Sequence, residues 1–169
     1  MRALFQAIRG DDAVLDTIRC FSQRQGQSLV YGLSGAEKHT VFAAAYAASP
    51  RPFVILTHSR DSLELWREDL SFLLPGKIVT EIPTVDEVNF RAAAKSLELA
   101  TRRMDVLGRL FRREPVIVLA LPAAAVQKVM SPEVFRNLRF HLSVGDEFKR
   151  EEFLPLESML SKAAAAYHL

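Results

Sequence analysis

Residues that form disulfides or bind metals are scarce in this sequence. Its 169 residues contain one cysteine, Cys20, so an internal disulfide is excluded. Its four histidines, at positions 39, 58, 141 and 168, include no close pair, so the spacing typical of zinc or iron ligands is missing. We therefore expect no metal site and no bound cofactor.

Long hydrophobic runs and an excess of charge of one sign are also missing. The longest apolar stretch, Val116 to Val126, is far shorter than the roughly 18 residues of a membrane span. Met1 opens a mixed segment without a secretory core. Lys and Arg number 22 against 20 Asp and Glu, so the formal charge of +2 does not indicate nucleic-acid binding. The 49% of hydrophobic residues suffices for a compact core. These features predict a cytoplasmic protein with no membrane segment.

The first four-fifths of the chain alternates between two hydrophobic patterns. Short apolar runs bounded by turn residues indicate strands, and longer stretches with apolar residues at helical spacing indicate helices. This alternation predicts an α/β fold, an open and mostly parallel sheet with helices on both faces. The predicted strands are 28–31, 53–56, 77–82 and 116–120, with 53–56 buried on both faces; the predicted helices are 12–25, 36–48, 59–74, 89–112, 122–130 and 131–137.

The pattern changes after residue 137. Apolar and polar residues alternate from 138 to 144, as in a half-exposed strand, and residues 148–169 have the spacing of a helix with no strand after it. We predict an α/β platform domain at 1–137. Residues 138–169 are then the beginning of a small second α+β module, cut short at Leu169.

The stretch Tyr31 to Thr40 lies between a predicted strand and a predicted helix, where a phosphate-binding loop belongs. In the pattern G-x-x-x-x-G-K-[ST], Gly32 and Lys38 stand at the right separation. Glu37 replaces the second glycine and places a carboxylate where a phosphate would bind. His39 replaces the hydroxyl that would hold magnesium. The pattern predicts a P-loop-like fold whose phosphate loop has lost its nucleotide; the alternative is a nucleotide site in which Lys38 still binds phosphate.

Ser34 has a second interpretation in the same loop. With Glu37 it has the spacing of a capping box, in which the two side chains satisfy the amides that a phosphate would have bound. The hydrolase pattern G-x-S-x-G fits poorly, because Gly35 follows Ser34 directly. A serine hydrolase with His141 or His168 as base therefore ranks third among the hypotheses.

Basic residues recur on one face of the predicted helix 89–112. We interpret this face as solvated; the alternative is a contact with phosphates or with an acidic protein surface. His58 ends a predicted strand at the edge where open α/β sheets bind ligands, but we interpret it as a loop histidine that caps local backbone. The basic residues of the face are Arg91, Lys95, Arg102, Arg109 and Arg113.

Taken in order, several short motifs resemble the amino-terminal region of bacterial transcription-repair coupling factor, the part that is similar to the damage-recognition B subunit of the excision nuclease. The resemblance covers nearly the whole chain. Its features are Gly32-Leu-Ser-Gly35 with Lys38, Thr57-His58, the stretch from Ser96 to Arg103 leading to Leu107, the strand and turn from Val116 to Pro122, Ser131-Pro132, and Val144-Gly145.

The resemblance implies an α/β domain like the first, nucleotide-binding domain of the excinuclease B subunit, followed by a docking domain that binds the excinuclease A subunit. This sequence departs from the nucleotide-binding domain in two places. Glu37 and His39 break its phosphate loop, and Pro83 to Asn89, where its DNA-probing hairpin would emerge, contains no tyrosine. The resemblance therefore implies a non-catalytic docking module. It places the excinuclease contact beyond Leu169, and it places ATP hydrolysis and binding to RNA polymerase and DNA in other modules of the parent protein.

Overall fold

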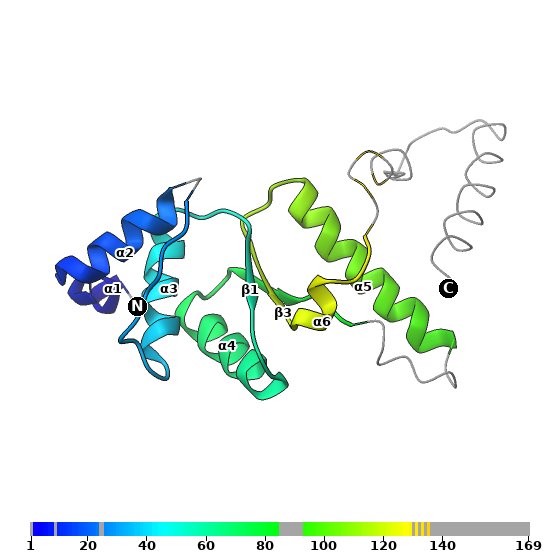
Figure 1. Cartoon of the computed structure of the whole chain (residues 1–169), viewed down its shortest axis with the longest axis horizontal. Helices are drawn as coiled ribbons and strands as arrows, with labels where there is room; N and C mark the ends of the chain where they lie inside the picture. The colour runs from blue at the N-terminus through cyan, green and yellow to red at the C-terminus, as the bar shows by residue number, and fades with distance from the viewer. Residues whose placement is uncertain are drawn as a thin grey trace.

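A computed structural model describes residues 2–8, 10–23, 26–84, 93–129, 131, 133 and 135. Three parallel strands form an open sheet in the order β1-β3-β2, and helices lie on both sides of it (Figure 1). The predicted α/β class is confirmed. The elements are α1 (Arg2–Ile8), α2 (Asp12–Ser22), α3 (Glu37–Ala48), β1 (Phe53–Leu56), α4 (Arg60–Leu73), β2 (Ile78–Glu81), α5 (Ala93–Phe111), β3 (Val116–Ala120) and α6 (Pro122–Ala125).

The central strand explains the order of the sheet. β3 is apolar throughout and buried at every position, so it takes the middle place between β1 and β2. The helix starts follow local chemistry. The Asp11 carboxylate accepts hydrogen bonds from the amides of Ala13 and Val14 at the start of α2, and the Ser59 hydroxyl accepts from the Ser62 amide at the start of α4.

Two cores lie on opposite faces of the sheet because alternate side chains of a strand point in opposite directions. Ile117 and Leu119 of β3 pack with α3 and α4, whereas Val116, Val118 and Ala120 pack with α5 and α6. Figure 1 shows these helix pairs on either side of the strands, with α1 and α2 next to α3. A smaller cluster of Ile18, Ala44 and Ala45 joins α2 to α3.

The predicted strand 28–31 is wrong. These residues lie in no strand, and no strand of the described residues pairs with them. Leu29 and Tyr31 are about nine-tenths exposed, at 86% and 87%. A four-residue extended segment has no internal hydrogen bonds, so without a partner strand its pattern alone does not make it a strand.

The predicted double burial of β1 is also wrong. Val54 and Leu56 are 52% and 58% exposed, while Phe53 and Ile55 pack against α3 and α4. β1 is an outer strand, and α5 packs over β3. No described helix covers the other face of β1.

Of three more predicted boundaries, only the end of the short helix before residue 131 can be compared with the structure. The short helix after residue 121 ends at Ala125, well before the predicted residue 130. The predicted start of the long helix falls within 85–92, outside the described residues, and α5 is described from Ala93. The predicted domain boundary and the module at 138–169 also lie outside the described residues.

Candidate functional site

Two glycines shape the loop that leads into α3. Gly32 and Gly35 have φ values of +83° and +52°, in the left-handed region that glycine adopts without strain. The chain then turns into the helix through a bond from the Glu37 amide to the Ser34 carbonyl, 3.2 Å long. This geometry explains why glycine is used at both positions.

The Glu37 carboxylate bends back onto this loop. Its Oε2 accepts from the Ser34 amide at 3.0 Å and lies 3.4 Å from the Ser34 hydroxyl. Only half of the predicted capping box is present: the Glu37 amide donates to the Ser34 carbonyl, and α3 begins after Ala36 with no side-chain cap. A negatively charged side chain therefore already accepts a hydrogen bond from one of the loop amides that would bind an anion.

The remaining loop residues divide between solvent and helix. Lys38 is exposed and forms no ion pair with any residue that the structure describes. The hydroxyl of Thr40 donates to the Ala36 carbonyl at 2.9 Å, so it bonds within the helix and does not serve the loop. Ser34 hydrogen-bonds Glu37 and no described histidine. His141 and His168, the bases of the hydrolase hypothesis, lie outside the described residues.

His39, in the position of the missing magnesium hydroxyl, points into the interface between α3 and α4. Its side chain is only 5% exposed; its Nδ1 lies 2.5 Å from Oδ2 of Asp69, and its ring centroid lies 4.0 Å from that of Trp66. An ionised carboxylate only accepts, so Nδ1 carries the proton. The other nitrogen, Nε2, is buried without a hydrogen-bond partner in the described part of the chain. His39 thus serves packing between the helices.

Sequence reasoning missed Asp69, and it missed the burial of Arg103. Trp66 and Asp69 are three residues apart on a helix, the spacing that places both on one face toward His39. Arg103 is buried, and its guanidinium donates to the carbonyls of Pro83 at 3.0 Å and Ala124 at 3.2 Å. The sequence does hold a signal for this burial. Arg103 stands three residues before Val106, so both lie on the face of α5 that packs in the core.

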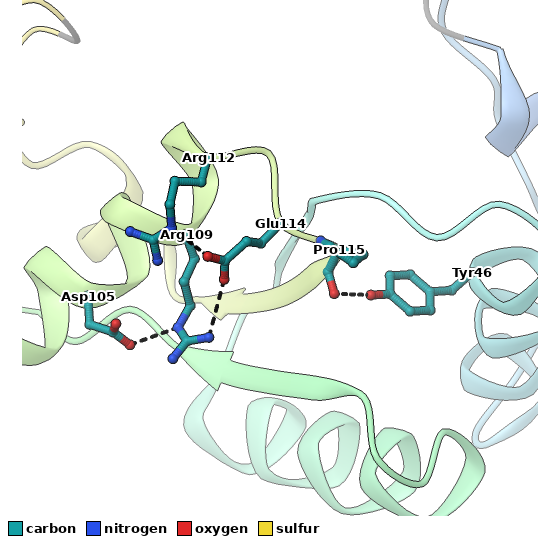
Figure 2. A network of polar contacts seen from close by, with 6 residues as sticks. All are labelled: Tyr46, Asp105, Arg109, Arg112, Glu114 and Pro115. Atoms are coloured by element: carbon teal, nitrogen blue, oxygen red, sulfur yellow. Dashed lines mark hydrogen bonds and ion pairs between the residues drawn. The ribbon is translucent and has the colours of Figure 1, made fainter. Parts of the chain in front are cut away.

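Acidic residues interleave with the predicted basic face of α5. Arg102 pairs with Glu98 at 2.7 Å, and Arg109 pairs with Asp105 at 2.9 Å and with Glu114 at 3.3 Å. Figure 2 shows the Arg109 guanidinium between these two carboxylates. Hydrogen bonding to Asp105 is the largest cause that raises the pKa of Arg109. Arg102 and Arg109 are therefore locally neutralised.

The other members of that face lie elsewhere. Arg91 and the side chain of Lys95 fall outside the described residues. Arg113 follows the end of α5, is exposed and has a φ of +55°. Its neighbour Arg112 binds Glu114 at 2.5 Å, and this bond is the largest cause that lowers the pKa of Glu114. His58, exposed after β1, has no hydrogen-bond partner among the described residues.

The described residues offer neither a cluster of metal ligands nor a membrane-spanning helix. They contain no group of three or more His, Cys, Asp or Glu side chains that could hold a metal ion. None of the helices described is long and apolar enough to span a bilayer.

Comparisons with known proteins point to one kind of relative. The transcription-repair-coupling factor of Bacillus subtilis strain 168 is 28% identical over 127 residues, which make up 75% of this chain and 11% of that protein. The chain resembles bacterial transcription-repair coupling factor. The coupling factor of Staphylococcus aureus strain USA300 is 24% identical over 155 residues, 91% of this chain. No protein-family model and no solved structure matches the chain.

The resemblance inferred from the motifs is thereby confirmed at the level of sequence. The chain spans only 11% to 13% of the length of these coupling factors.

Proposed function

We propose that this chain is a non-catalytic interaction module of a transcription-repair coupling factor. In this role it helps to recruit nucleotide excision repair proteins, with the excinuclease A subunit as the partner, to RNA polymerase stalled at DNA lesions. The similarity to coupling factors supports a role in transcription-repair coupling. The contact of Glu37 with the Ser34 amide supports the non-catalytic part, because it places a carboxylate in the only candidate phosphate loop of the described residues.

The electrostatic reason is direct. A phosphate loop binds an anion through backbone amides and a helix N-terminus. Here an anionic side chain already accepts from one of these amides. An incoming phosphate would therefore lack that hydrogen-bond donor and would be repelled by the negative charge of the carboxylate. His39 offers no compensation, since its ring is buried against Trp66 and Asp69.

A thermal-shift titration with ATP and magnesium tests the non-catalytic part. A ligand at a hundred times its dissociation constant would stabilise the protein by about 2.7 kcal/mol, a shift that is easily measured. We expect no shift for the wild-type chain. Glu37→Gly, which restores the second glycine, and Glu37→Gln, which removes only the charge, separate steric from electrostatic exclusion.

The alternative is a nucleotide-binding module that uses Lys38. Two features favour it: Lys38 is exposed and forms no ion pair with a described residue, and Gly32 and Gly35 shape the loop before it. A wild-type shift with ATP that Lys38→Ala abolishes would establish this alternative. The same shift would refute the exclusion by Glu37.

Recruitment is tested by capture of the purified excinuclease A subunit. The resemblance places the contact element beyond Leu169, so we expect a chain extended past this residue to bind and the 169-residue chain not to bind. Failure of both would contradict the proposed partner. This outcome is independent of the ATP titration.

A further inference from the structure

We propose that the edge of the sheet where all three strands begin is a docking surface for an acidic segment of a protein partner. Parallel strands start at the same edge, and each start here follows a basic residue. Arg51 precedes β1, Lys77 precedes β2 and Arg113 precedes β3. This proposal does not depend on the state of the phosphate loop.

The strand register sets the spacing of this basic edge. Phe53 pairs with Ile117 and Ile78 with Val116. Extending the two ladders toward the strand starts brings Arg51 and Lys77 level with Pro115, on either side of it. Neighbouring strands lie about 4.8 Å apart, so the starts of the outer strands β1 and β2 are separated by about 10 Å.

Some charged residues at this edge pair with one another, whereas others form no ion pair with a described residue. Glu114 is bound by both Arg109 and Arg112 (Figure 2). Lys77 and Arg113 are exposed, and neither forms an ion pair with a described residue. Two cations are thus left for an external partner.

Arg51 lies at the same edge but is already engaged. Its guanidinium donates to the Gln23 carbonyl at 3.4 Å and lies 4.8 Å from the centre of the Phe53 ring. Its charge still adds to the positive potential of the edge.

The backbone conformation of Arg113 is a second observation that supports a binding role for this edge. The amide of Arg113 donates to the Leu110 carbonyl and that of Glu114 to the Arg109 carbonyl, both at 3.0 Å, which is the Schellman pattern of a helix end. Arg113 is left-handed, with a φ of +55°, at a position of this pattern where glycine is favoured. An exposed arginine held at such a site is a local conflict, of the kind found where a side chain serves binding.

The chemistry of the edge fits a protein better than a nucleic acid. Glu114 lies within it, and a continuous phosphate backbone would meet this carboxylate. An acidic segment can place its own carboxylates at Lys77 and Arg113 and cover apolar surface nearby. Such surface is present: Phe72, in the last turn of α4, is 72% exposed. Apolar area with a charged rim is typical of protein interfaces.

Binding of a fluorescein-labelled oligo-glutamate peptide, followed by anisotropy at low salt, tests the surface. We expect the wild-type chain to bind and salt to weaken the binding. The double variant Lys77→Glu/Arg113→Glu should bind at least about tenfold more weakly. The control Arg19→Glu/Lys128→Glu changes the net charge equally, at exposed residues other than those that precede the strands, and should stay within about twofold of wild type.

Arg113→Gly separates binding from folding. Glycine relieves the left-handed conformation, so the midpoint of thermal unfolding should rise by about 2–4 °C, while peptide binding weakens. A structural role alone would not move the two in opposite senses. Wild-type binding by Arg113→Gly, equal loss in both double variants, no binding by the wild type, or tighter binding of a labelled DNA duplex through Lys77 and Arg113 would each overturn the proposal.

Discussion

The Nδ1 atom of His39 lies 2.5 Å from Oδ2 of Asp69, and this contact joins the first turn of α3 to the middle of α4. The ring of His39 also packs on Trp66 of the same helix. The side chain that would serve a nucleotide loop is therefore held inside the helix interface. His39 thus contributes to packing between α3 and α4.

Replacing Asp69 tests the energy of this contact. Asp69→Ala leaves a buried imidazole N–H without its acceptor, so we expect the free energy of unfolding to fall by about 1–3 kcal/mol. Glu68→Ala, at an exposed neighbour on the same helix with no partner in the described residues, should change it by less than about 0.5 kcal/mol. Urea denaturation measures both; equal effects would show that the contact contributes little.

Tyr46 provides a second test. Its side chain is fully buried in α3, and its hydroxyl donates to the Pro115 carbonyl at 2.5 Å, just before β3 (Figure 2). Tyr46→Phe should lower the free energy of unfolding by about 1–2 kcal/mol, because the carbonyl loses its donor. Tyr31→Phe, at an exposed tyrosine, is the control and should have almost no effect. Burial also raises the pKa of Tyr46, so an alkaline absorbance titration should show it ionising above its ordinary value of 10.0.

Glu114 predicts an acid dependence of stability. Its hydrogen bond to Arg112 lowers the pKa of the carboxyl below its ordinary value of 4.5. A lowered pKa in the folded state contributes stability above the unfolded pKa, and that contribution is lost as pH falls through the folded one. Glu114→Gln should therefore reduce stability near neutral pH and approach wild type as the pH falls through the lowered pKa of the folded carboxyl. Thermal unfolding across pH measures this, with Glu68→Gln as the control; a constant difference at all pH values would contradict it.

The uncovered face of β1 makes a prediction about two paired residues. Val54 and Val118 are neighbours in the sheet, but Val54 is half exposed and Val118 is fully buried. Val54→Thr should cost less than about 0.5 kcal/mol, whereas Val118→Thr buries a hydroxyl and should cost about 1–3 kcal/mol. Denaturant unfolding compares them. A large loss for Val54→Thr would mean that something covers β1.

Much of the fold could be predicted from local patterns. Asp11 and Ser59 mark helix starts because their side chains accept from nearby amides, and β3 is central because it is apolar at every position. The roles of the loop glycines and of Glu37 could be predicted from the sequence for the same reason, because they depend on neighbours within a few residues.

Contacts between distant parts of the chain could not be predicted from the sequence. The strand predicted at 28–31 failed because pairing needs a partner, and the double burial predicted for β1 failed because its outer place leaves Val54 uncovered. His39 was identified as a misfit in a motif, but only packing of α3 against α4 brought it to Asp69, 30 residues away. The sequence by itself determined helices α2 to α5, the strands β1 to β3 and the turn at Gly32 and Gly35 before α3, because these depend on periodicity and local hydrogen bonds. The tertiary structure alone decided which faces are buried and that Lys77 and Arg113 share one edge, because burial and electrostatic proximity arise only when distant segments pack together.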